Sequence, residues 1–186
     1  MTPIDFVVND ETRSRPDATE LLVFALRNGF GLTGTKVGCD SSTCGACTVL
    51  LDGEAVKSCT ILVGQAQGRR VTTIEGISVD VLTPIQQAFN DEHGLQCGYC
   101  TPGFIMSVTA LLSVFEDPDK NTVLEALEGN LCRCTGYTGI INAVMRAAAL
   151  VRGEDPPIKA GVAYNTPLAV IAVTDAVGEA SDVEVV

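Results

Sequence analysis

Residues 39–59 read CDSSTCGACTVLLDGEAVKSC, and the four cysteines of this stretch, Cys39, Cys44, Cys47 and Cys59, are separated by four, two and eleven residues. The apolar run at residues 47–51 ends at Asp52-Gly53, a dipeptide that predicts a hairpin with a second strand at residues 54–58. A loop with three closely spaced cysteines therefore leads into a hairpin. The fourth cysteine follows that hairpin, where the chain can return to the loop.

The C-x4-C-x2-C spacing of the first three cysteines is typical of plant-type iron-sulfur proteins, in which one loop wraps a 2Fe-2S cluster and supplies three thiolates. Gly38 and Gly45 permit unusual backbone angles and a close approach to sulfur. The residues between the cysteines are small and polar, which lets backbone N–H groups point at a cluster. We therefore expect a metal site made by Cys39, Cys44, Cys47 and Cys59.

The other four cysteines form a second set, Cys97, Cys100, Cys132 and Cys134, with spacings of two, thirty-one and one residues. Both pairs lie at predicted helix ends, so two facing loops can supply two thiolates each. Inward-pointing helix N-termini would stabilise a negatively charged cluster. The C-x-C pair argues against zinc, whose paired ligands are usually two to four residues apart. The second set therefore predicts a second cluster.

Hydrophobic patterning divides the chain into an α+β arrangement of three parts. Residues 1–78 are strand-rich, with strands expected at 4–8, 47–51, 54–58 and 70–74 and a helix at 19–28. Residues 79–153 are helical, with helices at 85–92, 101–115 and 140–151 and one beginning at a capping box of Thr122 and Glu125. Residues 154–186 form an acidic tail broken by prolines.

Composition restricts the partners and the compartment. The 12 basic and 23 acidic residues give a net charge of −11, and no basic cluster suggests nucleic acid as a partner. No secretory signal or transmembrane segment is evident, so we expect a soluble, cytoplasmic protein. In a reducing compartment, clustered thiols indicate metal or redox chemistry rather than disulfides.

Other interpretations of the cysteines remain open at this point. Two structural zinc sites would also use all eight thiols, and a secreted scaffold would pair them in four disulfides. A free-standing 2Fe-2S ferredoxin-like carrier is the main functional alternative to a subunit of a larger enzyme. Among neighbouring residues, His93 is expected to end a helix, and Tyr99 and Tyr137 to pack over the cysteine loops and exclude water.

Four motifs resemble a known family. They are GTKVGCD at residues 34–40, CGACTV at 44–49, QCGYCTPG at 96–103 and GNLCRCTGY at 129–137. Together they resemble the iron-sulfur subunit of the xanthine oxidase family of molybdenum hydroxylases, over roughly residues 4–150. Residues 39–44 are most similar to the small subunit of aerobic carbon monoxide dehydrogenase and its bacterial relatives.

The resemblance implies a β-grasp 2Fe-2S ferredoxin-like domain followed by a four-helix bundle that holds the second 2Fe-2S cluster. It also implies a dimer of heterotrimers with a large molybdopterin-binding subunit and a medium FAD-binding subunit. Electrons from oxidation of carbon monoxide, an aldehyde or an N-heterocycle would pass one at a time through both clusters to FAD. The set that includes Cys97 would lie nearer molybdenum, and Gln96 and Cys134 would approach the pterin.

The tail departs from the family pattern, in which the chain ends soon after the fourth helix. Its run at residues 168–173, LAVIAV, is too apolar for a fully solvated segment. We therefore expect residues 154–186 to lie in extended form on the molybdenum or flavin subunit.

Overall fold

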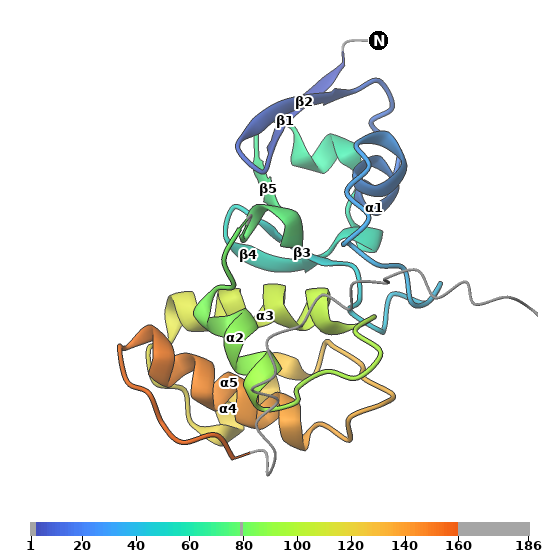
Figure 1. Cartoon of the computed structure of the whole chain (residues 1–186). Helices are drawn as coiled ribbons and strands as arrows, with labels where there is room; N and C mark the ends of the chain where they lie inside the picture. The colour runs from blue at the N-terminus through green and yellow to red at the C-terminus, as the bar shows by residue number, and fades with distance from the viewer. Residues whose placement is uncertain (1–2, 79, 160–186) are drawn as a thin grey trace, which may run out of the picture.

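A mixed five-stranded sheet forms the N-terminal half of the computed structural model, which describes residues 3–78 and 80–159 (Figure 1). The strands are β1 Ile4–Val8, β2 Glu11–Arg15, β3 Thr48–Leu51, β4 Glu54–Lys57 and β5 Arg70–Thr72. Their order is β2-β1-β5-β3-β4, with β1 and β5 parallel and the other neighbours antiparallel. A helical segment packs on this sheet, so the expected β-grasp arrangement is confirmed.

Two tight turns connect the hairpins. Asn9 and Asp10 between β1 and β2 have φ angles of 49° and 68°, and Asp52 and Gly53 between β3 and β4 have φ angles of 54° and 91°. Paired left-handed residues give the turn a twist that matches antiparallel strands, which is why Asn, Asp and Gly occupy these positions. The Asp52-Gly53 hairpin predicted from the sequence is therefore present, and it returns the chain to the cysteine loop.

The predicted helix at residues 19–28 is wrong in its extent and type. The chain forms only a short α1, Leu22–Phe24, followed by a π-helical segment, η1, over Ala25–Gly29. Arg27 lies in this π-helical segment, and its guanidinium donates to the carbonyl oxygens of Thr33 and Thr35 at 2.9 and 2.7 Å. These bonds tie the helix to the segment that leads to Cys39.

Residues 80–159 form four α-helices, in agreement with the number predicted for residues 79–153. They are α2 Pro84–Asp91, α3 Thr101–Val114, α4 Lys120–Leu127 and α5 Thr138–Val151. Three short 3-10 segments precede them: η2 Ser58–Thr60, η3 Val63–Ala66 and η4 Ile74–Gly76. The start of α4 differs from the prediction, because Asp119 rather than Thr122 caps it and accepts the Thr122 N–H at 2.8 Å. His93 follows α2 with a φ of 52°, which fits its expected place at a helix end.

Each half has its own hydrophobic core. The sheet half buries side chains between the strands and the helical segments α1 and η1, chiefly Phe6, Leu22, Leu26, Val49 and Val71. The helical half buries a second group between α2, α3 and α5, including Phe89, Phe104, Ile140 and Val144. Cys132 belongs to this second group and Cys100 packs against it. The second cysteine set is therefore supported by the core of the helical half.

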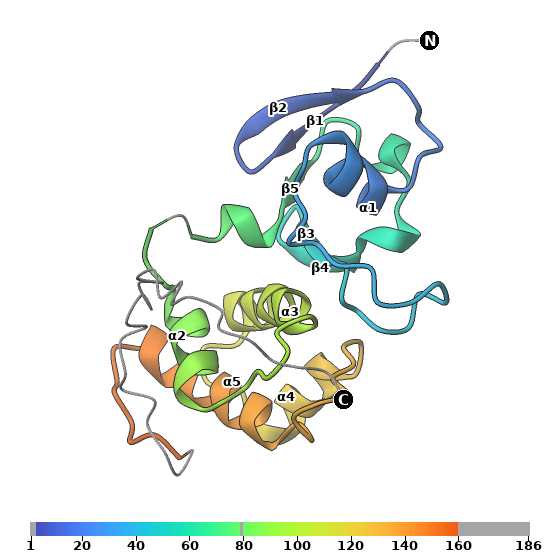
Figure 2. The ribbon, with the colours of Figure 1, turned by 45° about the vertical axis from the view of Figure 1, so that its right-hand side comes forward.

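Helix α3 is the part of the helical half that faces the sheet half, with β3 and β4 on one side and the other helices on the opposite side (Figures 1 and 2).

The residues after α5 are anchored on the helical half. Arg146 on α5 is buried and binds Asp91, Asp155 and the Pro156 carbonyl. The backbone N–H of Lys159 donates to Glu92 at 2.8 Å. These contacts fix the start of the predicted tail on the helical half, and the tail from residue 160 onward lies outside the described residues. No helix in the described part of the chain has the length and apolarity needed to cross a membrane.

Candidate iron-sulfur sites

The first cysteine set lies on the loop before β3 and just after β4. Cys44 and Cys47 are buried, and Cys39 and Cys59 are partly buried. The side chains of Cys39 and Cys44 lie within interaction distance of one another, as do those of Cys47 and Cys59. The β3–β4 hairpin thus brings Cys59 back to the loop, as the sequence suggested.

Backbone N–H groups converge on the thiols of this loop. The Cys44 N–H, the Cys44 side chain and the Ser41 N–H act on Cys39 and lower the pKa of its thiol to about 6. The Ala46 N–H lies 3.5 Å from Cys44 Sγ. Burial raises the pKa of the Cys47 thiol to about 11, so metal binding must displace a proton there. The lowered pKa of the partly buried Cys39 thiol therefore favours the thiolate, and the raised pKa of the buried Cys47 thiol favours the protonated form.

Lys57 supports the same loop from β4. Its ammonium group donates to the carbonyl oxygens of Ser42 and Thr43 at 3.1 and 3.3 Å. Ser42 has a left-handed φ of 59°, and its hydroxyl lies 3.6 Å from Cys59 Sγ. Lys57 therefore fixes the bend between Cys39 and Cys44 and places a positive charge beside it.

The second set gathers where the loop before α3 meets the loop between α4 and α5. Cys97 and Cys134 are exposed, with their sulfur atoms 3.6 Å apart. Cys100 and the buried Cys132 form the inner pair. Burial raises the pKa of the Cys100 thiol to about 12. At Cys132 burial is the largest influence and acts in the same direction, but hydrogen bonds from Thr135, Cys134 and Cys100 together outweigh it and lower the pKa of that thiol.

Two tyrosines hold the loops of the second set, a role beyond the packing that the sequence suggested. The Tyr137 hydroxyl accepts the Cys132 N–H at 2.9 Å and donates to the Asn130 carbonyl at 3.2 Å. The Tyr99 hydroxyl donates to the Val37 carbonyl at 2.8 Å and so links this loop to the first set. Each hydroxyl group therefore fixes the backbone at or near a cysteine, Val37 before Cys39 in one case and Cys132 itself in the other. Each tyrosine thus positions a cysteine loop in addition to packing over it.

The separation of one thiol pair is that of two ligands on one metal atom. Two thiolates bound to one tetrahedral metal at about 2.3 Å lie about 3.7 Å apart, close to the separation of Cys97 and Cys134. Within residues 3–78 and 80–159, no three His, Cys, Asp or Glu side chains gather tightly enough to hold one ion. A 2Fe-2S cluster takes four cysteine ligands, which is the number of thiols in each set. All eight cysteines are free thiols, so the disulfide interpretation is wrong.

Space and hydrogen-bonding capacity near the thiols also fit a sulfur-rich group. A cavity of about 190 Å³ is lined by Cys44 of the first set and by Cys97, Cys100 and Cys134 of the second. The hydroxyl of Thr101, which directly follows Cys100, is buried without a hydrogen-bond partner among the described residues. A group that carries sulfide beside Cys100 would give this hydroxyl an acceptor.

The remaining predicted residue, Gln96, is exposed and lies next to Cys97 at the outer edge of the second set. Apolar side chains flank this edge: Leu131 is 57% exposed, Tyr99 47% and Leu95 37%. Sequence reasoning did not single out Asn130, whose buried side chain joins the two halves. Its partners are 23 and 85 residues away, so no local pattern identifies it.

Comparisons with known proteins agree with this geometry. Residues 6–72 match the family model of a 2Fe-2S iron-sulfur cluster binding domain, and residues 73–157 match that of a [2Fe-2S] binding domain. The small subunit of nicotine 6-hydroxylase from Paenarthrobacter nicotinovorans is 52% identical over 153 residues, which cover 82% of this chain and 93% of that protein.

Two solved structures are similar as well. Quinoline 2-oxidoreductase from Pseudomonas putida contains a chain with a TM-score of 0.76 and 40% identity, and the match covers 82% of this chain and 98% of that one. Aldehyde oxidoreductase from Desulfovibrio desulfuricans has a TM-score of 0.79 and 44% identity, over 83% of this chain but only 18% of that longer chain.

The fold and the two thiol sets define a two-domain 2Fe-2S protein with an electron-transfer function. The cofactors of the chain itself are two 2Fe-2S clusters. The chain belongs to the iron-sulfur subunits of the xanthine oxidase family of molybdenum hydroxylases.

Proposed function

We propose that Cys39, Cys44, Cys47 and Cys59 hold one cluster in residues 1–78, and that the second cysteine set holds the other in residues 79–153. When bound, each cluster accepts and donates one electron at a time. The convergence of the eight thiols in two groups of paired side chains is the observation that carries this assignment. The roles of the surrounding residues follow from their contacts.

The contribution of this chain's own residues is to keep the cysteine loops in one conformation. Lys57 fixes the bend of the first loop, and Tyr137 fixes the backbone between Asn130 and Cys132. The inner thiols are buried on the apolar cores, which limits the access of water. A site whose loops do not move between charge states loses little energy to reorganisation during electron transfer.

We propose that the outer edge of the second set faces the large molybdopterin-binding subunit, with Gln96 and Cys134 toward the pterin. The exposed Cys97 and Cys134 and the apolar Leu131 and Tyr99 support this, because they line one cavity and would otherwise leave thiols and apolar groups in water. A free-standing carrier would have no partner to cover this edge. The first set would then pass electrons to the medium FAD-binding subunit.

The proposed complex is a cytoplasmic dimer of heterotrimers that oxidises an N-heterocycle. The 52% identity to the nicotine 6-hydroxylase small subunit, against 46% to the aldehyde oxidoreductase of Megalodesulfovibrio gigas, supports this substrate class. The chemistry on the substrate belongs to the partner subunit, so this chain supplies the electron route. The likeness of residues 39–44 to the carbon monoxide dehydrogenase small subunit remains a prediction.

Two serine variants of the assembled complex test the assignment. Cys59→Ser should perturb only the first cluster and impair reduction of flavin. Cys134→Ser should perturb only the second cluster and slow electron exit from molybdenum. Electron paramagnetic resonance identifies the altered cluster, and stopped-flow reduction by substrate identifies the slowed step. If both variants altered the same signal, or failed at the same step, the assignment of the sets would be wrong.

A further inference from the structure

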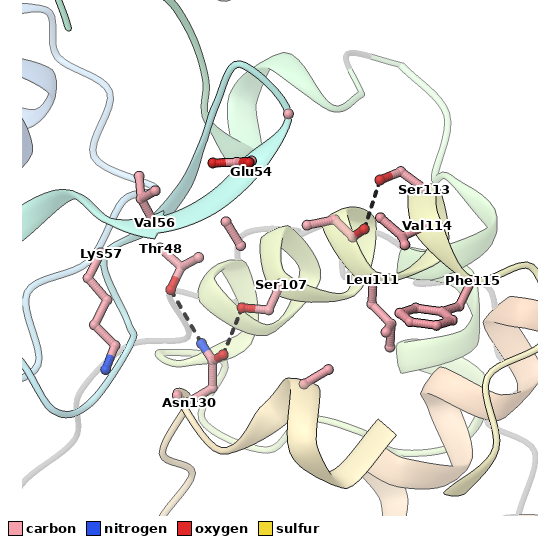
Figure 3. Close-up of a pocket in the computed structure, with 15 residues that line it drawn as sticks. Thr48, Glu54, Val56, Lys57, Ser107, Leu111, Ser113, Val114, Phe115 and Asn130 are labelled. Carbon is pink, nitrogen blue, oxygen red and sulfur yellow. Dashed lines mark hydrogen bonds between the residues drawn. The ribbon is translucent and has the colours of Figure 1, made fainter. Parts of the chain in front are cut away.

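The contact between the two halves centres on one buried side chain, Asn130, which is 6% exposed. Its Oδ1 accepts the hydroxyl hydrogen of Ser107 on α3 at 2.7 Å. Its Nδ2 donates to the carbonyl oxygen of Gly45 at 3.0 Å and lies 3.5 Å from the Thr48 hydroxyl oxygen. Figure 3 shows the carboxamide between Thr48 of the sheet half and Ser107 of the helical half. The two ends of one amide therefore bind opposite halves of the molecule.

The backbone beside Asn130 joins the two cysteine sets. The N–H of Leu131 donates to the carbonyl oxygen of Cys44 at 2.8 Å. Cys44 belongs to the first set, and Cys132, which follows Leu131, belongs to the second. A continuous link therefore runs from one thiol through covalent bonds, across one short hydrogen bond, to the other thiol.

Glycine at two positions lets the backbones approach this closely. A Cβ atom on Gly45 would overlap the Gly129 carbonyl and lie 2.7 Å from Asn130 Nδ2. A Cβ atom on Gly103, in the first turn of α3, would overlap the Gly45 carbonyl. Thr48 also donates to that carbonyl, at 2.7 Å, so the oxygen that Asn130 binds is itself fixed. The Gly45 carbonyl is thus held by Asn130, by Thr48 and by the close approach of Gly103. These contacts set the position of the Cys44 loop against the Leu131 backbone.

We propose that Asn130 is a positioning residue for electron transfer between the two clusters. It holds the bond between Cys44 and Leu131; with both clusters bound, one electron would pass along this route from the cluster held by the second cysteine set, which would be oxidised, to the cluster held by the first set, which would be reduced. No covalent bond or proton changes place in the step. The inference rests on the proposed function, because it assigns a route between the two sites named there.

The test compares variants of the full chain with both clusters bound. Asn130→Asp keeps the size of the side chain but replaces the Nδ2 donor with an oxygen that repels the Gly45 carbonyl. Ser107→Ala removes only the support on the other side of the amide. Asn121→Asp makes the same substitution on the exposed surface of α4 and serves as the matched control.

Two measurements report the geometry rather than the stability. Pulsed electron paramagnetic resonance gives the dipolar coupling between the two reduced clusters, which varies with the inverse cube of their distance. Flash reduction gives the rate of electron transfer between them. Because misplacement by about 1 Å can cost up to about a hundredfold in a positioned step, we expect Asn130→Asp to be slower by roughly tenfold and to show altered coupling. Ser107→Ala should shift both readouts in the same direction by less, and Asn121→Asp should match the wild type.

The outcomes separate this inference from the proposed function. If the wild-type chain lacked two interacting clusters, the proposed function would fail. If the wild type showed them and Asn130→Asp kept the wild-type coupling and rate, Asn130 would have only a structural role and the inference would be wrong. Should Asn130→Asp fail to fold, unchanged coupling and rate in Ser107→Ala would overturn the inference equally.

Discussion

Replacing Gly103 by alanine tests how closely the two halves must approach one another. Gly103 lies in the first turn of α3, and an added Cβ would overlap the Gly45 carbonyl oxygen and lie 3.2 Å from Ala46 Cα. Both neighbours are backbone atoms, so neither can turn aside as the end of a flexible side chain would. The helix must shift or the cysteine loop must give way.

The expected cost follows from two opposing effects. Overpacking of a well-packed contact costs about 1–3 kcal/mol. Alanine improves the helix by at most about 1 kcal/mol relative to glycine. Because the overlapped Gly45 carbonyl is a backbone group, the overpacking cost lies in the upper part of its range, about 2–3 kcal/mol. The net loss is therefore about 1–2 kcal/mol, which for a chain of this size lowers the melting temperature by about 2–8 °C.

Thermal unfolding followed by circular dichroism measures this effect, and Gly129→Ala is the matched control. Gly129 borders the same contact, but its added Cβ would meet nothing nearer than Lys57 Cε at 3.8 Å, an ordinary contact distance. We expect Gly129→Ala to keep the melting temperature of the wild type. If Gly103→Ala were as stable as Gly129→Ala, or gained stability from its better helix propensity, the close approach of α3 to the Gly45 carbonyl would be refuted.

Two further changes address the first loop and the tail. Lys57→Met removes the ammonium group beside the Ser42 and Thr43 carbonyls, so the reduction potential of the first cluster should fall, because the extra negative charge of the reduced state loses a nearby positive partner. A redox titration should show this shift while Lys57→Arg keeps most of the wild-type value; an equal shift in both variants, or in the second cluster, would contradict it. Deletion of residues 160–186 leaves the Lys159 contact with Glu92 in place. It should spare both cluster spectra and weaken recovery of the complex on size-exclusion chromatography. Unchanged assembly and stability of the complex would contradict a docking role for the tail.

The elements that the sequence predicted correctly have strong local signals. The Asp52-Gly53 turn needs left-handed residues, and the prolines near the starts of α2 and α3 mark positions where a missing N–H costs little. The cysteine spacings likewise depend on chemistry that is local to each loop. A short stretch of sequence is therefore enough to predict each of these features.

The elements that the sequence did not predict depend on distant partners or on competing local patterns. Strand β2, ETRSR, has no apolar alternation, because it lies at the sheet edge and buries little. The π-helical segment at Ala25–Gly29 shares its apolar spacing with an ordinary helix. The α4 cap differs because Asp119 binds both the N–H and the hydroxyl of Thr122, which removes Thr122 as a cap. Asn130 acquires its importance only when the two halves meet.

The central claim is that this one chain holds two different 2Fe-2S clusters, one for each cysteine set. The most direct measurement is low-temperature electron paramagnetic resonance of the reduced protein during a redox titration, with the iron content measured on the same sample. We expect about four irons per chain, two for each cluster, and two rhombic signals that titrate separately. Separate titration follows from the different surroundings of the two sets, one beside a lysine on a strand-flanked loop and the other among helix ends. A single species that integrates to one spin per chain would contradict the claim.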